Sequence, residues 1–200
     1  MGNTDKFDRI ANSYDTPERI HIAKVASEAI KAYLGDTKSK NAIDFGCGTG
    51  LVGMNLLSEF KTMLFLDTSE NMLQIIKEKI SAADARNAST LCFDFETSSP
   101  SNLSADYIVM AQVLLHIQDY AALLTKLYDV LDDEGHLLIV DFNKNDKVVS
   151  ELVHNGFDQE QLGELMRKIG FRDIRSKTIY NGSKIFMNQD ASLFIMDAKK

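Results

Sequence analysis

Cysteine is almost absent from this sequence: Cys47 and Cys92 are the only two among 200 residues, and they lie far apart. One such pair is too few for the disulfide framework of a small secreted domain, and its spacing does not fit a zinc-binding cluster. A low cysteine count is typical of proteins from a reducing compartment. We therefore expect a cytoplasmic protein with two buried, unpaired cysteines and no metal site.

Long apolar runs are missing as well. No stretch approaches the ~18 consecutive apolar residues that a transmembrane helix needs, and residues 1–15 hold no apolar core of signal-peptide length. Proline occurs only twice, and no internal repeat or low-complexity tract marks a linker between domains. These absences predict a single domain, residues 1–200, that does not enter a membrane.

Positive charge is in the minority, because 22 Lys and Arg residues stand against 29 Asp and Glu residues and give a net charge of −7. This balance argues against a diffuse basic surface, which is the usual footprint of nucleic-acid or anionic-lipid binding. The hydrophobic content of 44% is enough for one sizeable core at this length. We expect a small-molecule ligand, neither a nucleic acid nor a membrane as partner, and a monomer or homodimer.

Short apolar runs bounded by turn residues have the length of buried strands, and continuous apolar runs are typical of parallel strands covered on both faces. Five such runs occur, at residues 41–45, 62–66, 89–93, 106–111 and 136–142. Apolar residues at helical spacing lie around them, and each of these helices begins after a good N-cap residue. The N-caps are Thr16, Ser69, Asp119 and Asp158. The alternation of strands and helices predicts a parallel α/β sheet with helices on both faces.

Both ends of the chain depart from this alternation. Before the first strand, an apolar stripe predicts a helix that ends at Gly35. The stripe consists of Ile20, Ala23, Ile30 and Leu34. At the other end, residues 171–180 and 191–198 have extended patterns, with turn residues at 181–183 and 188–190 between them. We expect an antiparallel hairpin there, at the edge of the sheet.

The segment Asp44–Gly50, with the sequence Asp-Phe-Gly-Cys-Gly-Thr-Gly, leaves the first predicted strand and opens a helix. Glycine has no Cβ and lets a ligand approach the backbone closely, and ligands of open parallel sheets bind at the carboxyl ends of strands. Gly48–Gly53 also fits the dinucleotide pattern G-x-G-x-x-G, and Asp67 lies near the offset of a ribose-binding acid. Asp44 favours a cationic ligand over a pyrophosphate. An NAD(P)-dependent oxidoreductase remains the alternative.

The same segment, Asp44–Gly50, matches in full the motif acid-x-Gly-x-Gly-x-Gly. The sequence therefore resembles the class I S-adenosylmethionine-dependent methyltransferases, and the resemblance extends over nearly the whole chain. Asp67 and Met72 look like the family's second-strand segment, in which the acid binds both ribose hydroxyls and the Met packs on the adenine. Asp94 and Phe95 are similar to the pair at the adenine edge.

Further segments extend the resemblance. Residues 113–119 resemble the segment after the fourth strand, and residues 131–137 resemble the turn into the fifth, with His136 where a second glycine is common. Tyr14 and Asp15 resemble the N-terminal segment of small-molecule methyltransferases in the group that includes the ubiquinone and menaquinone enzymes. In that group the N-terminal segment closes over the cofactor.

The resemblance implies a doubly wound, Rossmann-like α/β sheet, mostly parallel, with strand order 3-2-1-4-5-7-6 and a C-terminal antiparallel hairpin. Residues 1–35 would form an N-terminal helical lid, residues 40–142 the cofactor-binding core, and residues 143–200 the acceptor side. The implied cofactor is S-adenosyl-L-methionine. The residues expected to bind it are Tyr14, Asp44, Gly46, Cys47, Gly48, Gly50, Asp67, Thr68, Met72, Asp94, Phe95 and Ala111.

Three carboxylates at successive strand ends give this expectation a physical basis. Asp44, Asp67 and Asp94 offer acceptors to the amino group, the ribose diol and the adenine amine of a cofactor that carries an added sulfonium charge. Three acids at three strand ends are improbable by chance, although each one alone could be a surface or helix-capping residue.

Methyl transfer from a sulfonium is an in-line displacement with a good leaving group. Proximity and orientation supply much of the acceleration, and a base is needed only where the acceptor must lose a proton. Histidine titrates near neutral pH, so His116 after the fourth strand and His154 before the last helix are the candidate bases, with structural roles as the alternative for each. We expect methyl transfer to a small molecule; a non-catalytic S-adenosylmethionine-binding protein is the second alternative.

Overall fold

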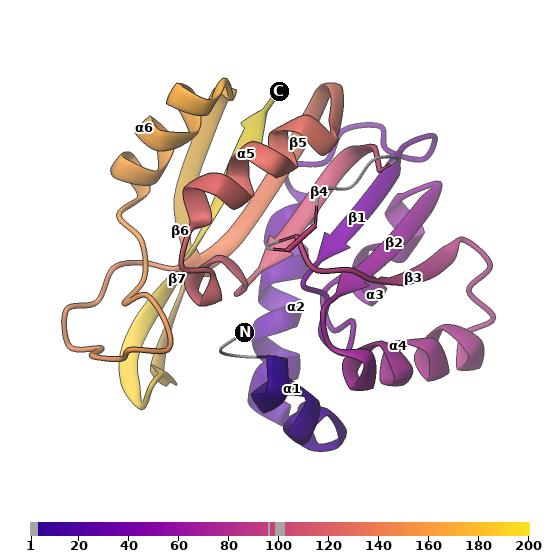
Figure 1. Cartoon of the computed structure of the whole chain (residues 1–200), viewed down its shortest axis with the longest axis horizontal. Helices are drawn as coiled ribbons and strands as arrows, with labels where there is room; N and C mark the ends of the chain where they lie inside the picture. The colour runs from indigo at the N-terminus through magenta and orange to yellow at the C-terminus, as the bar shows by residue number, and fades with distance from the viewer. Residues whose placement is uncertain (1–3, 96, 99–102) are drawn as a thin grey trace.

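The computed structural model describes residues 4–95, 97–98 and 103–200, and its centre is one seven-stranded sheet (Figure 1). The strands are β1 (Asn41–Phe45), β2 (Thr62–Asp67), β3 (Ala88–Cys92), β4 (Ala105–Ala111), β5 (Leu131–Phe142), β6 (Arg172–Phe186) and β7 (Gln189–Lys199). Their order is β3-β2-β1-β4-β5-β7-β6. Strands β1 to β5 pair in parallel, and β7 pairs antiparallel with both β5 and β6. The predicted fold class and strand order are confirmed.

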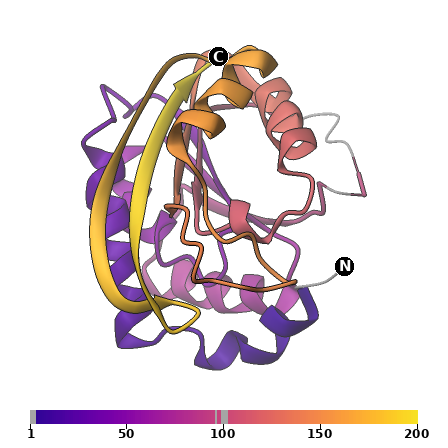
Figure 2. The same cartoon turned by 90° about the vertical axis from the view of Figure 1, so that its left-hand side faces the viewer.

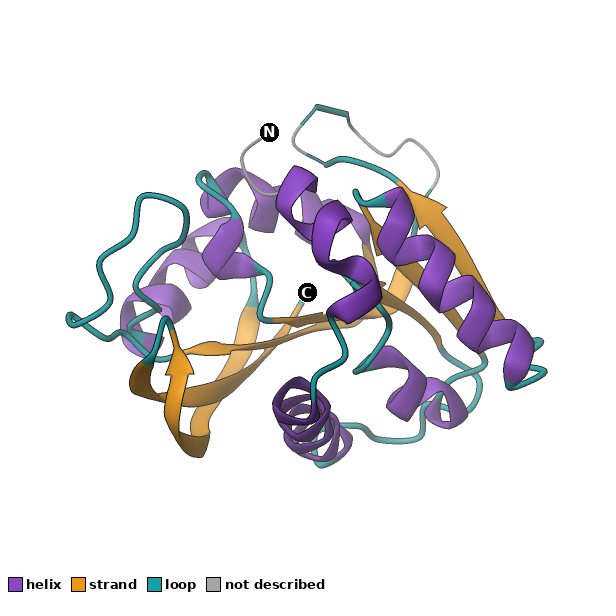
Figure 3. Cartoon of the chain, turned by 90° about the horizontal axis from the view of Figure 1, so that it is seen from below, coloured by secondary structure: helices purple, strands orange, loops and turns teal. Residues whose placement is uncertain are grey.

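Helices cover both faces of this sheet (Figures 1 and 3). They are α1 (Thr4–Ile10), α2 (Pro17–Lys31), α3 (Gly53–Leu56), α4 (Glu70–Ala82), α5 (Tyr120–Val130) and α6 (Gln159–Ile169), with short 3₁₀ helices η1 (Ala11–Ser13), η2 (Leu57–Glu59) and η3 (Leu114–His116). Buried apolar residues of α5 and α6 belong to one hydrophobic cluster, whereas Leu56 of α3 and Leu73 and Ile76 of α4 belong to a second cluster. Among the residues that the structure describes, no helix is both long and apolar enough to cross a membrane.

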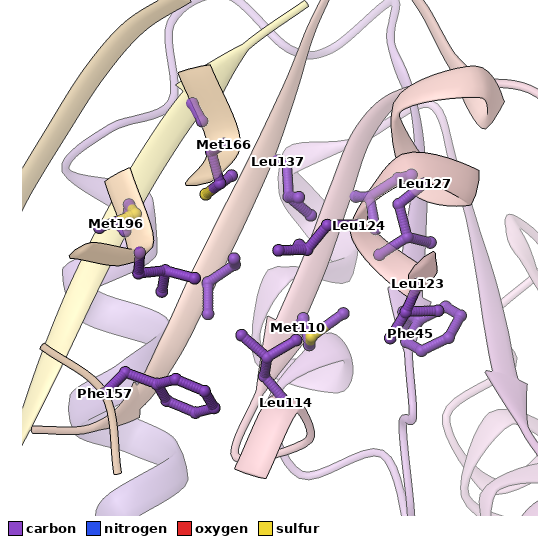
Figure 4. Packing of buried hydrophobic residues seen from close by; sticks show 14 of the residues in the cluster. Phe45, Met110, Leu114, Leu123, Leu124, Leu127, Leu137, Phe157, Met166 and Met196 are labelled. Carbon is purple, nitrogen blue, oxygen red and sulfur yellow. The ribbon is translucent and has the colours of Figure 1, made fainter. Parts of the chain in front are cut away.

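The strands supply both clusters because successive side chains of a strand point to opposite faces. In β5, Leu137 and Ile139 belong to the cluster under α5 and α6, whereas Leu138 and Val140 belong to the other. Figure 4 shows part of the first cluster, in which Met110 of β4 lies beside Leu114 of η3 and near Phe45 of β1. Burial on both faces explains why the strands read as continuous apolar runs.

The four predicted N-caps are confirmed. Each side chain accepts a hydrogen bond from a backbone N–H in the first turn of its helix, which satisfies a donor that the helix itself leaves unpaired. The bonds join Thr16 to Arg19 (3.3 Å), Ser69 to Met72 (3.1 Å), Asp119 to Ala122 (3.0 Å), and Asp158 to Glu160 and Gln161 (both 3.0 Å).

Three local predictions were wrong. Helix α2 ends at Lys31, before Gly35, and Ile20 is 48% exposed because the buried stripe of this helix runs instead through Ile22, Ala23, Ala26 and Ile30. Strand β5 begins at Leu131 rather than at residue 136, because Leu131 already pairs with Ala105 of β4. Cys47 is buried, but Cys92 is exposed at the end of edge strand β3.

The C-terminal hairpin is longer than its sequence pattern indicates (Figure 2). Strand β6 continues through the predicted turn at residues 181–183 and ends at Phe186, with irregular pairing between Gly182 and Phe186. The chain reverses at Met187 and Asn188, whose φ angles are 50° and 62°. Two successive positive φ angles are typical of tight hairpin turns, which usually contain glycine. The reversal meets the second predicted turn segment, residues 188–190, at Asn188, and asparagine tolerates a positive φ without being glycine.

Candidate cofactor pocket

A pocket of about 600 Å³ lies at the carboxyl ends of β1, β2 and β4. Phe45, Leu66 and Ala111, at the ends of these strands, line it. Strand β1 is followed along the chain by β2 on one side and has β4 on its other side, so the strand order reverses here. Open α/β sheets bind ligands at such a reversal, and the volume suits a small molecule.

The loop after β1, residues 46–50, forms one wall and needs glycine for two reasons. Gly46, Gly48 and Gly50 have φ angles of 65°, 53° and 79°, a region that other residues rarely adopt. A Cβ on Gly46 would also lie 2.6 Å from Cγ2 of Val113, and one on Gly50 would lie 1.9 Å from Cδ1 of Ile76. Gly46 and Gly48 line the pocket, whereas Gly50 packs against α4 behind it.

Asp67, the last residue of β2, is the acidic side chain best placed for a ligand. Its Oδ2 accepts the Gly48 N–H at 2.8 Å and its Oδ1 accepts the Ser69 N–H at 2.9 Å. Burial raises the pKa of this carboxyl, and the two N–H groups oppose the rise. A carboxylate has about four acceptor positions, so two remain for hydroxyl groups of a ligand in the pocket.

Asp44 does not reach the pocket. It is 2% exposed, and its Oδ2 accepts the Gly53 N–H at 3.1 Å, at the start of α3. Because side chains alternate along β1, Asp44 points to the face that α3 covers. Burial is the main cause that raises its pKa to about 7, and the Gly53 N–H opposes it. The structure thus places Asp44 behind the glycine loop, where it supports the loop's last turn.

The structure brings ten of the fourteen predicted site residues together in the pocket. The ten are Tyr14, Gly46, Gly48, Asp67, Thr68, Met72, Asp94, Phe95, Ala111 and His116. Asp44, Cys47, Gly50 and His154 are not among the described residues that line it. The Nε2 of His154 lies 2.8 Å from the Ile117 carbonyl oxygen, which can only accept, so this nitrogen carries the hydrogen. The ring also packs against Tyr120 and Phe157.

The N-terminal segment contributes Phe7 of α1 and Tyr14 to the lining of the pocket. In Figure 1, α1 lies on the side of the sheet to which the arrowheads of β1 and β4 point. The ring of Phe7 meets the ring of His116 edge to face, with centroids 5.1 Å apart, and lies 6.3 Å from the ring of Tyr14. The guanidinium carbon of Arg19 lies 4.2 Å from the centroid of Tyr14. Burial raises the pKa of the Tyr14 hydroxyl. Phe7 and Tyr14 thus form an aromatic cover.

Two aspartates fasten this cover to the pocket wall. Asp8 accepts the Ser69 hydroxyl, and its carbonyl oxygen accepts the Asn71 side-chain amide at 3.2 Å. Asp15 accepts the Thr49 hydroxyl and pairs with Lys79 of α4 at 2.6 Å. The segment from Asp8 to Asp15, one part of the predicted lid of residues 1–35, therefore lies against the glycine loop and the residues that follow β2.

Several pocket residues were not predicted from the sequence. They are Phe7, Phe45, Leu66, Phe93, Gln112, Val113, Ile117, Gln118, Leu123, Glu151 and Leu152. Phe45 and Leu66 could have been found, because both lie at the carboxyl ends of predicted strands. Glu151 and Leu152 lie in the connector between β5 and α6, where neither helical nor strand periodicity gives a signal.

The charge of the lining is one-sided. Asp67, Asp94 and Glu151 line the pocket, and its described lining includes no Lys or Arg. A dinucleotide brings a doubly negative pyrophosphate, which three carboxylates would repel. A ligand with a positive charge suits this lining better.

Comparisons with known proteins agree on the kind of fold and domain. Residues 19–176 match a family model described as a methyltransferase domain. The chain is 31% identical over 144 residues to a demethylmenaquinone methyltransferase of Listeria monocytogenes, an alignment that covers 68% of this chain and 60% of that protein. This chain therefore spans less than two thirds of that relative's length.

Two solved structures show the same architecture. An S-adenosylmethionine-dependent methyltransferase from Aquifex aeolicus has a TM-score of 0.73 at 18% identity, over 96% of this chain and 97% of that one. Phosphoethanolamine N-methyltransferase 2 of Haemonchus contortus, in complex with S-adenosyl-L-methionine, has a TM-score of 0.71 at 19% identity, over 87% of this chain and 52% of that one. At these identities the likeness is one of fold.

Proposed function

The chain belongs to the class I S-adenosylmethionine-dependent methyltransferases, and from this premise we propose that its pocket binds S-adenosylmethionine and that the protein methylates a small molecule. The observation that carries the proposal is the acid-lined pocket at the glycine loop, with Asp67 facing it and no Lys or Arg in its described lining. A sulfonium cofactor with ribose hydroxyls complements that lining, and a pyrophosphate does not.

The residues of the pocket divide by the part of the cofactor that they suit. Asp67 would accept the two ribose hydroxyls with the acceptor positions that Gly48 and Ser69 leave open. Met72 supplies an apolar surface for the adenine, and Asp94 an acceptor for its amine. Asp44 acts indirectly, because it holds the loop rather than the ligand.

The transfer itself needs positioning more than acid or base chemistry. The acceptor's electron pair forms a bond to the methyl carbon while the carbon–sulfur bond breaks and its electron pair stays on sulfur. The aromatic cover of Phe7 and Tyr14 excludes water and restricts the approach of the acceptor. Where the acceptor must lose a proton, His116 is the side chain placed to take it, because its ring lies in the lining beside Phe7.

The lining also favours a class of acceptor. Val113, Ile117 and Leu152 offer apolar contacts beside His116, and Glu151 would repel an anionic group. We therefore propose an acceptor without an anionic group near its reacting atom, such as an uncharged aromatic. The Listeria relative's name points to a quinone of this kind. With its net charge of −7 and two free cysteines, the chain suits a small-molecule partner and a cytoplasmic location better than a nucleic acid or a secreted setting.

Release of S-adenosylhomocysteine from S-adenosylmethionine tests the proposal. The screen contains reduced 1,4-naphthoquinone, a phenol, a primary aromatic amine and a carboxylic acid as acceptor probes. We expect turnover with at least one of the three uncharged probes and none with the carboxylic acid. Turnover with the carboxylic acid alone would overturn the acceptor class. Binding of S-adenosylhomocysteine without any turnover would favour a non-catalytic binding protein.

A further inference from the structure

Asp141, the second-last residue of β5, is a buried carboxylate to which the proposed methyl transfer assigns no role. It is 0% exposed, its Oδ1 accepts the N–H of its neighbour Phe142 at 2.8 Å, and its Oδ2 accepts the N–H of Leu115 at 3.2 Å. In the described part of the chain, Asp141 forms no ion pair. Burial of a carboxylate without a cationic partner costs free energy of folding, and an apolar residue at the same position would often give an equally stable protein. Its position therefore calls for another explanation.

Leu115 lies in the middle of η3, which follows β4 and carries one side of the pocket. Val113, His116 and Ile117 of this segment line the pocket, and we call these three residues the acceptor wall. The first N–H groups of a short helix have no partner within it. No side chain at Val113, the N-cap position, supplies one, and the carboxylate of Asp141 reaches across from β5 to the Leu115 N–H.

A second brace holds the same segment from the connector between β5 and α6. The backbone N–H of His154 donates to the Leu115 carbonyl oxygen at 2.8 Å, and its ring Nε2 donates to the Ile117 carbonyl oxygen at 2.8 Å. Asp141 and His154 thus hold opposite hydrogen-bonding groups of Leu115. The acceptor wall is held by two residues, Asp141 and His154, that are not among the described residues lining the pocket.

The arrangement repeats what Asp44 does on the other face of the sheet. Asp44 is the second-last residue of β1, and it accepts the Gly53 N–H after the glycine loop, on the cofactor side. Asp141 holds the Leu115 N–H after β4, on the acceptor side. The two carboxylates belong to different strands, point to opposite faces, and support different walls of one pocket.

We propose that Asp141 is a positioning residue for methyl transfer: by accepting the Leu115 N–H it fixes the acceptor wall, and with it His116 and the bound acceptor, without touching the cofactor. The inference rests on the proposed function. A displacement of about 1 Å in a positioned group can lower a rate on the order of a hundredfold. Loss of the hydrogen bond between Asp141 and Leu115 should therefore lower the turnover rate more than the affinity for the cofactor.

The test compares Asp141→Asn with Asp44→Asn and with Asp197→Asn as matched control. Asp197 is a buried carboxylate of the same sheet (1% exposed) that pairs with His136 and Arg175, away from the pocket. For each variant, calorimetry gives the affinity for S-adenosylhomocysteine. Steady-state kinetics give kcat and KM for the acceptor probe that the wild-type protein methylates in the screen. Hydrogen exchange reports on the amide of Leu115.

We expect Asp141→Asn to keep its affinity for S-adenosylhomocysteine within about threefold, to lose at least about tenfold in kcat/KM for the acceptor, and to speed exchange of the Leu115 amide. Asp44→Asn should instead weaken S-adenosylhomocysteine binding, and Asp197→Asn should change neither. Unchanged kcat/KM in Asp141→Asn, or an equal loss of cofactor affinity, would overturn the proposal.

The wild-type protein provides a second measurement that does not depend on folding of a variant. On pH titration followed by NMR, the Leu115 amide resonance should follow the carboxyl resonance of Asp141; independent titration would overturn the proposed bond. Failure of the wild-type protein to bind S-adenosylhomocysteine would refute the proposed function itself. Wild-type turnover with an unimpaired Asp141→Asn variant would refute only the role of Asp141.

Discussion

Replacement of Asp67 by Asn should weaken S-adenosylhomocysteine binding while leaving the fold intact. In the wild-type protein both carboxylate oxygens already accept a backbone N–H, from Gly48 at 2.8 Å and from Ser69 at 2.9 Å. Asn has one acceptor oxygen and one NH₂ group. One of the two backbone donors would then face another donor, and the ribose hydroxyls would lose the charged acceptor.

The magnitude follows from these bonds. A hydrogen bond to a charged group contributes about 1.5–3 kcal/mol, and the substitution removes at least one such bond to the ribose. Since about 1.4 kcal/mol corresponds to a factor of ten, the Kd for S-adenosylhomocysteine should rise by roughly 10- to 150-fold. Isothermal titration calorimetry measures this rise.

Two controls make the result interpretable. Asp94→Asn removes the charge at the other end of the proposed cofactor site, where one amine contact is at stake, and should have a smaller effect. Thermal unfolding of each variant separates lost binding from lost folding. A folded Asp67→Asn variant with a Kd within threefold of wild type would refute the assignment of Asp67 to the ribose.

Three further predictions concern the cover, the candidate base and a buried acid. Tyr14→Ala removes a half-buried ring from the pocket and should raise the Kd for S-adenosylhomocysteine by roughly 5- to 30-fold in calorimetry, given about 1–2 kcal/mol for such a contact; an unchanged Kd would count against a lid. His116→Ala and His116→Gln should lower kcat on the order of a hundredfold for an acceptor that loses a proton, and unchanged turnover at saturating cofactor would exclude His116 as the base. Asp141 has its pKa raised to about 7 in the folded chain, mainly by burial, from an ordinary value of 3.8. The folded state therefore binds the extra proton, so this carboxyl's contribution to stability is complete below pH 4 and is lost as the pH rises to about 7. Urea unfolding at pH 5, 6 and 7 gives the free energy of unfolding as a function of pH. The decrease that the Asp141 carboxyl causes in the wild-type protein, up to about 1.4 kcal/mol per pH unit, should be absent from Asp141→Asn, and equal pH dependence in the two proteins would contradict the raised pKa.

Much of the fold follows from local signals in the sequence. The N-caps at Ser69 and Asp158 and the apolar runs of β1 and β2 depend on neighbours in the chain, and all are confirmed. The glycine loop could be predicted for the same reason, because its positive φ angles need glycine at fixed positions.

Features that depend on contacts between distant segments were not predictable in this way. Asp44 marks a strand end correctly, but β1 is buried on both faces, so no alternation of polarity shows which face its carboxylate points to. His154 reads as a candidate base, yet its ring is bonded to Ile117, 37 residues away. Glu151 enters the pocket from a connector whose path depends on β5 and α6 rather than on its own sequence.

The central claim is that the pocket at the glycine loop binds S-adenosylmethionine. Separate calorimetric titrations of the wild-type protein with S-adenosylhomocysteine, NAD and NADP test it most directly. The acid-lined pocket predicts one binding site for S-adenosylhomocysteine, weakened by Asp67→Asn, and no binding of either nicotinamide dinucleotide. Binding of NAD or NADP without binding of S-adenosylhomocysteine would contradict the account.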